Sequence, residues 1–336
     1  LFRSSIGFAA FVNCPRLGDV TIPASVTSIG ELAFLACDGL TNINVDSENL
    51  CYRSVDGVLF DWIQDVLIRF PSGRAGSYAI PAGVTSVCDN AFANCTGLSA
   101  VTIPDSVTFI GSGAFSYCTG LGAVTIPGSV TSIEEGTFAS CTGLASVTMD
   151  AGVTSIGARA FENCTGLTSV TIAASVTSIG LQAFRFCTSL TSVTIPASVT
   201  SLGYAAFSYC TNLSAVFFRG DASTFSIDYD PFYSSRATIY YLPGSTGWAA
   251  TFYDHPTLLW NPQVQQDHQF GVHGDRFGFN ISGTTNIPVV VEATTNLSSG
   301  IWMPLLTNTL GTAGALFFSD LESTSHPARF YRIVWP

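Results

Sequence analysis

Histidine and acidic side chains gather in one short run of the sequence, DHQFGVHGD (residues 267–275). Imidazole nitrogens and carboxylate oxygens are the donors that zinc and related metals bind in proteins. The whole chain has only four histidines, and this run holds two of them. A solvated linker between two domains explains the same composition without a metal, and we favour that interpretation. The sequence therefore predicts no metal site and no cofactor.

Catalytic motifs are missing from the rest of the chain. The sequence has no Gly-x-Ser-x-Gly nucleophile elbow, no His-Glu-x-x-His zinc motif and no glycine-rich phosphate loop. We predict no catalytic residue and no enzyme. An enzymatic role would need a pocket beside the C-terminal domain, near His255 or His268.

Two short acidic motifs lie just after residue 218. Arg219, Gly220 and Asp221 spell the tripeptide of integrin ligands, although matches of three residues arise by chance. Asp221, Asp228 and Asp230 have the oxygen ligands that calcium prefers, but aspartate is also common in turns. We favour chance for the tripeptide and turn chemistry for the aspartates.

The composition excludes several classes of partner. The chain is 47% hydrophobic, only 10% charged and carries a net charge of −11, and all 12 of its basic residues are arginine. An acidic chain without a basic cluster is a poor binder of nucleic acid. No apolar run approaches the roughly 18 residues that cross a bilayer, so we predict no membrane insertion.

A repeat of fixed length dominates the first two thirds of the sequence. The motif Ala-Phe-x-x-Cys, with Thr137 in place of alanine in one copy, recurs with every step equal to 23 residues except one of 58, and its cysteines lie at 14, 37, 95, 118, 141, 164, 187 and 210. A period between 20 and 29 residues is typical of leucine-rich solenoids. In the unit that follows Cys95, Val101 and Ile103 alternate as in a strand, and Pro104 ends it. We expect the phenylalanines to form a continuous buried column.

The outward positions of these strands form the candidate binding surface. They carry small uncharged side chains, and the column reads Thr21, Asn44, Thr102, Thr125, Thr148, Thr171, Thr194 and Phe217. Threonine suits exposed strands, so this column has a purely structural explanation. The alternatives are a surface that binds a sugar polymer or an extended protein, or an ice-binding face.

The repeats resemble a known family. The segment CTGLTSVTIAASVTSIG (residues 164–180), followed by Ala183 and Phe184, is similar to the BspA-type leucine-rich repeat of bacterial surface and secreted proteins. The resemblance covers roughly residues 3–218 and implies a right-handed solenoid in an extracellular or cell-surface protein. Residues 49–87 resemble the longer, hairpin-bearing unit of that family, which explains the 58-residue step; this unit spans about 46–87. Because Leu1 falls inside a repeat, we expect an N-terminal cap upstream.

The cysteines divide into a column and a pair. Eight occupy equivalent positions, so their Cβ atoms point in parallel and do not converge as a disulfide requires. We predict free, buried thiols there. Cys51 and Cys88 lie outside the column within one unit, and a disulfide between them is an open alternative.

The sequence changes character after residue 218. Residues 219–260 are rich in aromatics and are predicted to cap the solenoid. Residues 261–336 alternate short strands with turns, which predicts a small antiparallel β-sandwich. The segments VVVEATTNLSSGIWMPL and PARFYRI resemble C-terminal β modules of secreted verrucomicrobia-like bacterial proteins. The predicted fold class is thus mainly β, a right-handed leucine-rich-repeat solenoid (residues 1–218) followed by a β-sandwich.

These features together predict an extracellular, non-enzymatic recognition or adhesion protein. Its expected partner is an extracellular glycan or a surface protein of a host or neighbouring cell, bound by the strand face of the solenoid. The main alternative is a structural subunit that self-assembles into a surface layer or filament. An ice-binding protein and an enzyme are the remaining alternatives.

Overall fold

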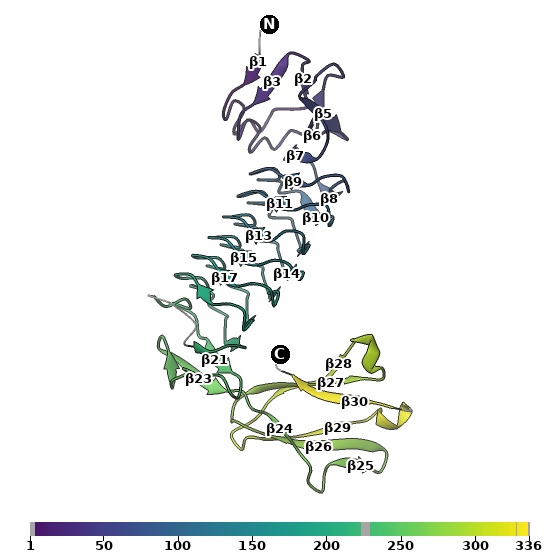
Figure 1. Cartoon of the computed structure of the whole chain (residues 1–336), viewed down its shortest axis with the longest axis vertical. Helices are drawn as coiled ribbons and strands as arrows, with labels where there is room; N and C mark the ends of the chain where they lie inside the picture. The colour runs from purple at the N-terminus through teal and green to yellow at the C-terminus, as the bar shows by residue number, and fades with distance from the viewer. Residues whose placement is uncertain (1–3, 223–228, 327, 335–336) are drawn as a thin grey trace. The chain divides into compact units, whose positions relative to one another are not determined.

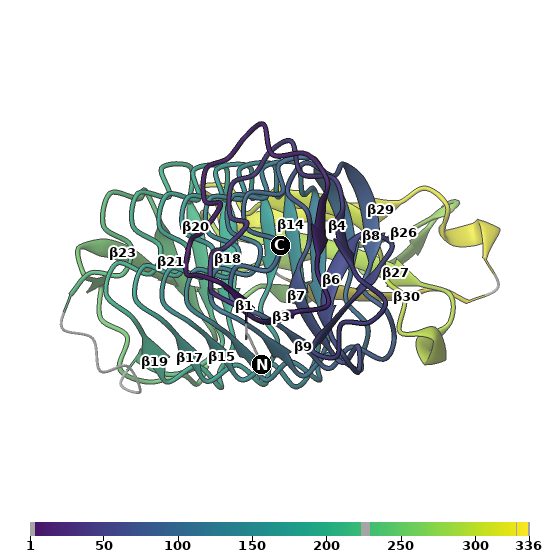
Figure 2. The ribbon, with the colours of Figure 1, turned by 90° about the horizontal axis from the view of Figure 1, so that it is seen from above.

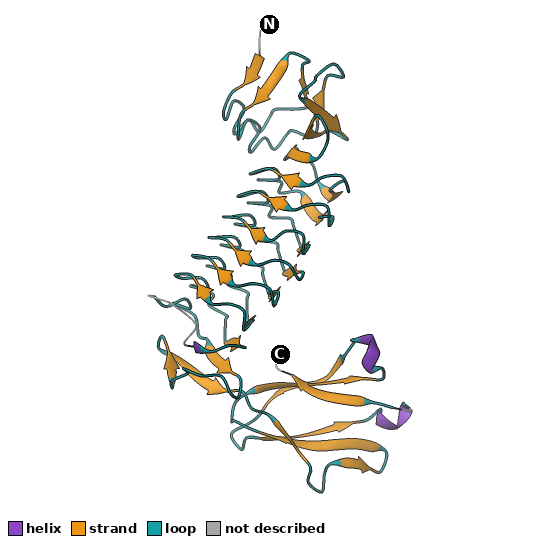
Figure 3. Cartoon of the chain, in the orientation of Figure 1, coloured by secondary structure: helices purple, strands orange, loops and turns teal. Residues whose placement is uncertain are grey.

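The computed structural model describes residues 4–222, 229–326 and 328–334. The chain divides into two compact units. The first comprises Leu1–Ile239 and Thr246–His255, and the second comprises Tyr240–Ser245 and Pro256–Pro336. Strands and turns make up almost all of both units (Figure 3). Within the described residues, no helix has the length and apolar character needed to cross a bilayer.

Two columns of short strands run along opposite sides of the solenoid (Figures 1 and 2). The first column contains the Val-x-Ile strands: β2 (Val20–Ile22), β4 (Ile43–Val45), β8 (Gly76–Ala79), β10 (Leu98–Thr102), β12 (Ala123–Ile126), β14 (Ser146–Met149), β16 (Ser169–Thr171), β18 (Ser192–Ile195) and β20 (Ala215–Phe218). The second column contains β1 (Ser4–Ile6), β3 (Val26–Ile29), β9 (Ser86–Val87), β11 (Phe109–Ile110), β13 (Ser132–Ile133), β15 (Ser155–Ile156), β17 (Ser178–Ile179) and β19 (Ser201–Leu202). Each coil thus contributes one strand to each side.

Strands of successive coils pair in parallel and in register. Thr125 lies opposite Thr148, and Thr148 lies opposite Thr171. The same pairing superimposes the apolar positions, so Val124 and Val147 are both buried. Because one face of each strand points to the interior, a register slip of one residue would expose these side chains. The alternation of buried and exposed side chains in each repeat therefore determines the register in which its strands pair.

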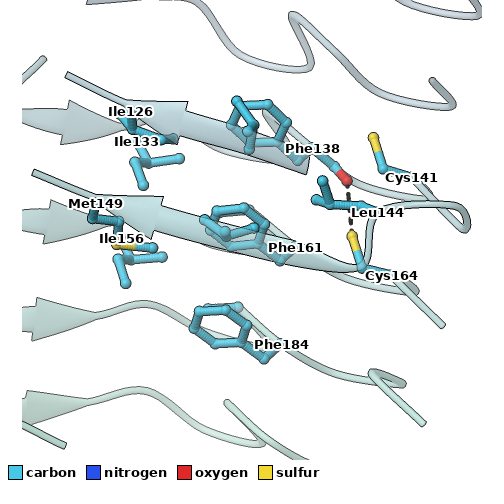
Figure 4. Close-up of a cluster of buried hydrophobic side chains, with 14 of the residues drawn as sticks. Ile126, Ile133, Phe138, Cys141, Leu144, Met149, Ile156, Phe161, Cys164 and Phe184 are labelled. Atoms are coloured by element: carbon cyan, nitrogen blue, oxygen red, sulfur yellow. Dashed lines mark hydrogen bonds between the residues drawn. The ribbon is translucent and has the colours of Figure 1, made fainter. Parts of the chain in front are cut away.

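Six of the eight motif phenylalanines form the aromatic spine of the solenoid, so the predicted continuous column is interrupted at the long unit. Phe92, Phe115, Phe138, Phe161, Phe184 and Phe207 are fully buried, and neighbouring rings stack with centroids 4.7–5.3 Å apart (Figure 4). Two rings outside the repeat motif extend the spine, Phe70 at one end (5.0 Å from Phe92) and Phe232 at the other (5.7 Å from Phe207). Phe11 and Phe34 stack separately, 5.4 Å apart.

The column cysteines are free thiols that hydrogen-bond from coil to coil. Seven of the eight are buried, and Cys14 is half-buried. Each thiol from the second coil onward donates to the carbonyl of an aromatic residue in the preceding unit; Cys164 Sγ, for example, lies 3.1 Å from Phe138 O (Figure 4). The others are Cys37, Cys95, Cys118, Cys141, Cys187 and Cys210, at 3.0–3.9 Å. Burial in this apolar surrounding raises the pKa of Cys164 to about 12.

The long unit carries the predicted hairpin. β6 (Val58–Asp61) and β7 (Val66–Arg69) pair antiparallel, and β5 (Tyr52–Val55) joins β6 on its other edge. The sheet order is β11-β9-β7-β6-β5, so the hairpin extends the second strand column. The buried core separates at this point into one cluster that runs from Ile22 to Leu59 and another that runs from Val58 to Ile239.

Cys51 and Cys88 are not bridged in the structure, where all ten cysteines are free. Cys51 precedes β5 and Cys88 follows β9, and β6 and β7 lie between those two strands. Three strand spacings amount to about 14 Å. A disulfide needs Cα atoms within about 7 Å, so the sheet order opposes the bridge that we considered.

Arg69 replaces main-chain donors where the long unit interrupts the repeat. In an ordinary junction the N–H of Asn94 donates to Ser116 O of the next coil (2.8 Å). The equivalent carbonyl after the long unit belongs to Ala93, and it accepts from Arg69 Nη2 (3.0 Å) instead. Arg69 Nη1 donates to Asn90 O, and the side chain is only 7% exposed. The Arg69 guanidinium thus donates to a carbonyl that, at an ordinary junction, accepts a hydrogen bond from the main chain of the neighbouring coil.

We expect Arg69→Lys to lower the free energy of unfolding by about 1–3 kcal/mol, because a lysine retains the buried charge but cannot reach both carbonyls with a planar fork. Chemical denaturation followed by circular dichroism measures the loss. Arg74→Lys is the matched control, since Arg74 also donates to a carbonyl, that of Asp56, but at a solvent-exposed place. Equal losses in the two variants would contradict this role of Arg69.

The second unit contains two antiparallel sheets. One is formed by β24 (Gln263–Gln265), β25 (Gly271–His273), β26 (Arg276–Ser282) and β29 (Ala315–Asp320), and the other by β27 (Pro288–Thr294), β28 (Met303–Thr309) and β30 (Phe330–Val334). Two short 3-10 turns, η2 (Leu297–Ser299) and η3 (Ser323–Ser325), connect strands. Tyr331 of β30 stacks on Phe277 of β26 at 4.9 Å, so rings of both sheets meet in the core. The predicted fold class, a mainly β solenoid followed by a β-sandwich, is confirmed.

The predicted capping segment contributes to both units. Its strands are β21 (Thr238–Tyr241), β22 (Thr251–Phe252) and β23 (His255–Leu259), which continue the sheet of β18 and β20 in the order β18-β20-β21-β23-β22. In the first unit, Trp248 and Phe252 pack on Phe218, with ring centroids 5.0 and 5.9 Å away. These rings cover the last repeat strand.

Candidate ligand-binding surface

The predicted threonine column lies on the solvent side of the first strand column. Thr21, Asn44, Thr102, Thr125, Thr148 and Thr171 are exposed, and Thr194 is half-buried. Their neighbours are small, and Ala123, Ala145 and Ser169 are exposed beside them. The in-register pairing stacks equivalent side chains about 4.8 Å apart. The result is an uncharged surface edged by hydroxyl groups.

Phe217 does not belong to this surface, and its placement there was wrong. It pairs with Thr194 in the expected register, but its side chain is only 1% exposed. Three consecutive residues of β20, Val216, Phe217 and Phe218, are buried. Both faces of this strand are therefore covered, as in a strand that lies inside a core. The exposed column ends one coil earlier.

The hydroxyls of this column are free, whereas those of the threonines that immediately precede β15 and β17 are not. Among the described residues, Thr102, Thr125, Thr148 and Thr171 make no side-chain hydrogen bond. On the other side, Thr154 donates to Thr131 O (2.9 Å) and Thr177 donates to Thr154 O (3.1 Å). One set of hydroxyls thus holds coils together, whereas the other is unpaired among the described residues and is available as donor and acceptor.

A shallow depression of about 260 Å³ interrupts the strand face between β10 and β12. These two strands belong to different hydrogen-bonded sheets. Thr102 and Thr125 line the depression, together with Asp105 and Asp150 from the corners that follow the strands. The depression adds carboxylates to an otherwise uncharged face. Sequence analysis missed both aspartates because neither occupies the outward strand position.

A second depression, of about 310 Å³, lies on the turns of the last coils. We call it the tyrosine pocket, and its lining residues are Gln182, Arg185, Tyr204, Ala205, Ser208, Tyr209, Tyr229, Asp230 and Tyr233. No single motif of the sequence predicts this pocket. A comparison of the variable positions of the repeats would have found it, since Tyr204 and Tyr209 are both aromatic where most earlier coils carry small or polar residues.

A third cavity, of about 390 Å³, accompanies the long unit. Phe34, Tyr52, Ile68 and Arg69 are among the residues that line it. It lies where the repeat is interrupted and the core separates into two clusters. The Arg69 guanidinium is engaged with carbonyls of the following coil, as described above, so this cavity is a consequence of the interrupted stacking.

The other sequence motifs do not form sites in the described residues. His268 and His273 are both exposed, and Asp267 accepts hydrogen bonds from Asn280 Nδ2 (2.8 Å) and Gln269 N (2.9 Å), which lower its pKa. No group of three or more metal-ligating side chains comes together within the described ranges.

The aspartates after residue 218 are engaged in local structure. Asp221 of the Arg-Gly-Asp tripeptide accepts from Thr246 N (2.6 Å). Asp230 accepts from Phe232 N (2.8 Å) and lies 3.4 Å from His255 Nε2, and Asp228 lies outside the described residues. The carboxylates of Asp221 and Asp230 thus stabilise turns.

The comparisons with known proteins agree with the repeat architecture. The model of the BspA type leucine rich repeat region matches in six copies, over residues 4–58, 70–187 and 133–247. No curated protein matches the chain. Among solved structures, a leucine rich cell surface protein of Faecalibacterium prausnitzii is 34% identical, with a TM-score of 0.53 over 66% of this chain and 52% of that protein.

Two further structures share the fold. A leucine-rich repeat protein of Bacteroides ovatus is 28% identical, with a TM-score of 0.56 over 72% of this chain and 59% of that one. The pneumococcal vaccine antigen PcpA is 23% identical, with a TM-score of 0.54 over 71% of this chain and 54% of that one, which shows a common fold. The chain therefore spans little more than half the length of these proteins. Since the family model matches well over half of the chain, this protein belongs to the BspA-type leucine-rich repeat family.

Proposed function

We propose that the protein acts at the bacterial cell surface as a non-enzymatic recognition or adhesion protein, and that its strand face binds an extended partner, either a polysaccharide or a surface protein. The Faecalibacterium relative is described as a cell surface protein, and PcpA is a vaccine antigen, which supports a surface location. The observation that carries the proposal is the contrast between the free hydroxyls of Thr125, Thr148 and Thr171 and the hydrogen-bonded hydroxyls of Thr154 and Thr177.

The geometry of the strand face supports an extended partner in particular. Equivalent hydroxyls recur at the spacing of parallel strands, so a polymer laid along the stack meets the same donor and acceptor in each coil. Each contact is weak, but many repeated contacts add up along a chain. The depression beside Asp105 and Asp150 offers one place on this face where the partner can be held in register.

A triple variant tests the proposal. Thr125→Val, Thr148→Val and Thr171→Val together remove three free hydroxyls while keeping the β-branched shape. We expect the variant to bind at least tenfold more weakly to at least one member of a panel of immobilised polysaccharides and extracellular-matrix proteins that the wild type retains. Surface plasmon resonance measures the difference, and melting temperature verifies the fold.

The matched control changes the other strand column. Thr108→Val, Thr154→Val and Thr177→Val together should retain binding and lose stability instead, by about 1 kcal/mol for each hydrogen bond removed. Equal binding by both triple variants would contradict the proposal, as would a wild type that binds no member of the panel.

Self-assembly is the competing function, because an open-ended stack of low charge can join edge to edge. Static light scattering at high protein concentration distinguishes the two. Higher oligomers that the Thr125, Thr148 and Thr171 substitutions leave intact would favour a structural subunit over a recognition protein.

A further inference from the structure

The tyrosine pocket has the composition of a carbohydrate site. Tyr204, Tyr209, Tyr229 and Tyr233 surround it, and Ala205 is the one aliphatic side chain among the described residues of its lining. We propose that the tyrosine pocket binds a short stretch of a neutral glycan, at a site separate from the threonine column. The ring faces would pack against the C–H groups of a sugar, and the hydroxyls at the ring edges would bond to its hydroxyls.

The other repeats serve as an internal control for this inference. The positions of Tyr204 and Tyr209 are variable in the repeat. The coils that begin at Gly111, Glu134 and Gly157 carry Ser112, Glu135 and Ala158 in place of Tyr204. The coils with Cys95, Cys141 and Cys164 carry Asn94, Ser140 and Asn163 in place of Tyr209. The solenoid therefore folds without aromatic residues at these positions, so both tyrosines together need a further explanation.

Closure of the core does not explain these tyrosines. Tyr204, Tyr229 and Tyr233 are 52–64% exposed, whereas Phe207 and Phe232 beneath them are fully buried. The rings are ordered against one another instead: Tyr204 meets Tyr229 edge to face at 5.2 Å, and Tyr209 meets Tyr233 in the same way at 5.7 Å. Such paired rings present rigid, amphipathic walls to solvent at low entropic cost.

Hydrogen-bonding groups in the tyrosine pocket are available to a ligand. Among the described residues, the hydroxyls of all four tyrosines make no hydrogen bond. Ser208 also lines the pocket; its side chain is 1% exposed, and its Oγ has no partner. A buried hydroxyl without a partner is costly, so a group that reaches Ser208 would be stabilising.

The charges of the tyrosine pocket favour a neutral ligand. Arg185 is paired with Glu162 (3.3 Å), and its guanidinium lies over the rings of Phe186 (4.4 Å) and Tyr209 (5.4 Å). Asp230 is engaged with Phe232 N and lies beside His255. Arg185 and Asp230, the charged residues among the described part of the lining, are both partnered, so an anionic or cationic sugar gains little. The cavity volume lies at the lower end of the range for ligand pockets, which fits one or two sugar rings.

The backbone at Tyr209 shows which substitution the fold accommodates. Tyr209 has a φ of +59°, and Tyr117 (+59°) and Phe186 (+62°) adopt the same left-handed conformation at this repeat position. Asn94 and Asn163 adopt it as well in their coils. Asparagine tolerates this region better than a bulky aromatic residue does, so an asparagine at position 209 is compatible with the fold.

The experiment replaces Tyr209 with asparagine. Tyr209→Asn introduces the residue of sister coils and removes the ring contacts of Tyr209 with Phe186 (4.9 Å) and Tyr233 (5.7 Å), so its melting temperature is measured to verify the fold. Tyr117→Asn is the matched control, since Tyr117 occupies the same repeat position, has a φ of +59° and is exposed, but does not line the tyrosine pocket. Affinity electrophoresis in gels that contain a soluble β-glucan, mannan or xylan measures binding, with alginate and gelatin as the anionic and polypeptide probes.

We expect at least one neutral polysaccharide to retard the wild type and the Tyr117→Asn variant, and Tyr209→Asn to bind it at least tenfold more weakly. The threonine triple variant should be retarded as strongly as the wild type, which separates this site from the strand face. The inference is overturned if no neutral polysaccharide retards the wild type, if Tyr209→Asn binds normally, or if gelatin alone depends on Tyr209.

Discussion

Truncating Phe138 to alanine will lower the free energy of unfolding of the solenoid by about 3–5 kcal/mol, because the ring is fully buried and leaves a cavity behind. Phe138 lies in the middle of the aromatic spine, with Phe115 at 5.2 Å and Phe161 at 5.3 Å. Both stacked pairs are lost in the variant. Since each coil contacts only its neighbours, we expect the damage to be local.

Two measurements check this result. Chemical denaturation gives the free energy, and hydrogen exchange should report loss of protection in the coils of Phe115 and Phe161 before the others. Phe11→Ala is the control, since Phe11 is 36% exposed and stacks on Phe34 alone, and it should cost about 1 kcal/mol. A single cooperative transition of Phe138→Ala at the wild-type midpoint would show that the spine does not stabilise the fold.

Raising the pH above 9 will destabilise the solenoid through its cysteine column. Burial raises the pKa of Cys95 and Cys187 well above the ordinary value of 9.0 and that of Cys164 to about 12; the pKa of Cys118 is also raised, chiefly by its hydrogen bond with Cys141. The unfolded chain releases these protons near pH 9, and the folded chain holds them to higher pH. Stability is therefore complete below pH 9 and falls as the pH rises toward 12, by about 1.4 kcal/mol per pH unit for each thiol.

Denaturation curves at pH 8, 9, 10 and 11 in the presence of a reductant measure this slope. The four thiols titrate over the same range, so the denaturant concentration at the midpoint of unfolding should fall steeply between pH 9 and pH 11. Cys164→Ala should flatten the slope by the share of one thiol, about 1.4 kcal/mol per pH unit. Tyr78, whose burial raises its pKa to about 12, adds to the same loss. A stability that stays constant from pH 8 to 11 would mean that the thiols ionise freely in the folded chain.

The solenoid could be predicted from the sequence because its information is local and repeated. A period of 23 residues, an alternation of Val and Ile and a proline after the strand each determine one part of a coil, and stacking follows from the apolar positions. The hairpin expected in the long unit is present, and it pairs Phe60 with Leu67. The roles of the cysteines were only half predicted, because their burial was expected and their hydrogen bonds to the preceding unit were not.

The features that sequence reasoning missed depend on the ends and interruptions of the array. Phe217 follows the alternation of every earlier strand, and only the packing around β20 makes it buried. In the sequence, Arg69 looks like an ordinary strand residue. Its role depends on the Ala93 carbonyl, to which it donates where the repeat is interrupted. The tyrosine pocket combines Tyr204 and Tyr209 from a repeat with Tyr229 and Tyr233 from beyond it, so no single repeat unit contains its pattern.

The in-register pairing of successive coils has a mechanical consequence. Strands that hydrogen-bond only to the coils above and below lie across the direction of stacking, so tension applied along the stack loads one junction at a time. A coil that peels away releases 23 residues, or about 75 Å of extended chain, while its neighbours stay intact. A solenoid held at both ends under flow would therefore extend in steps of one coil. Each step lowers the tension, and the coils would refold when the flow decreases.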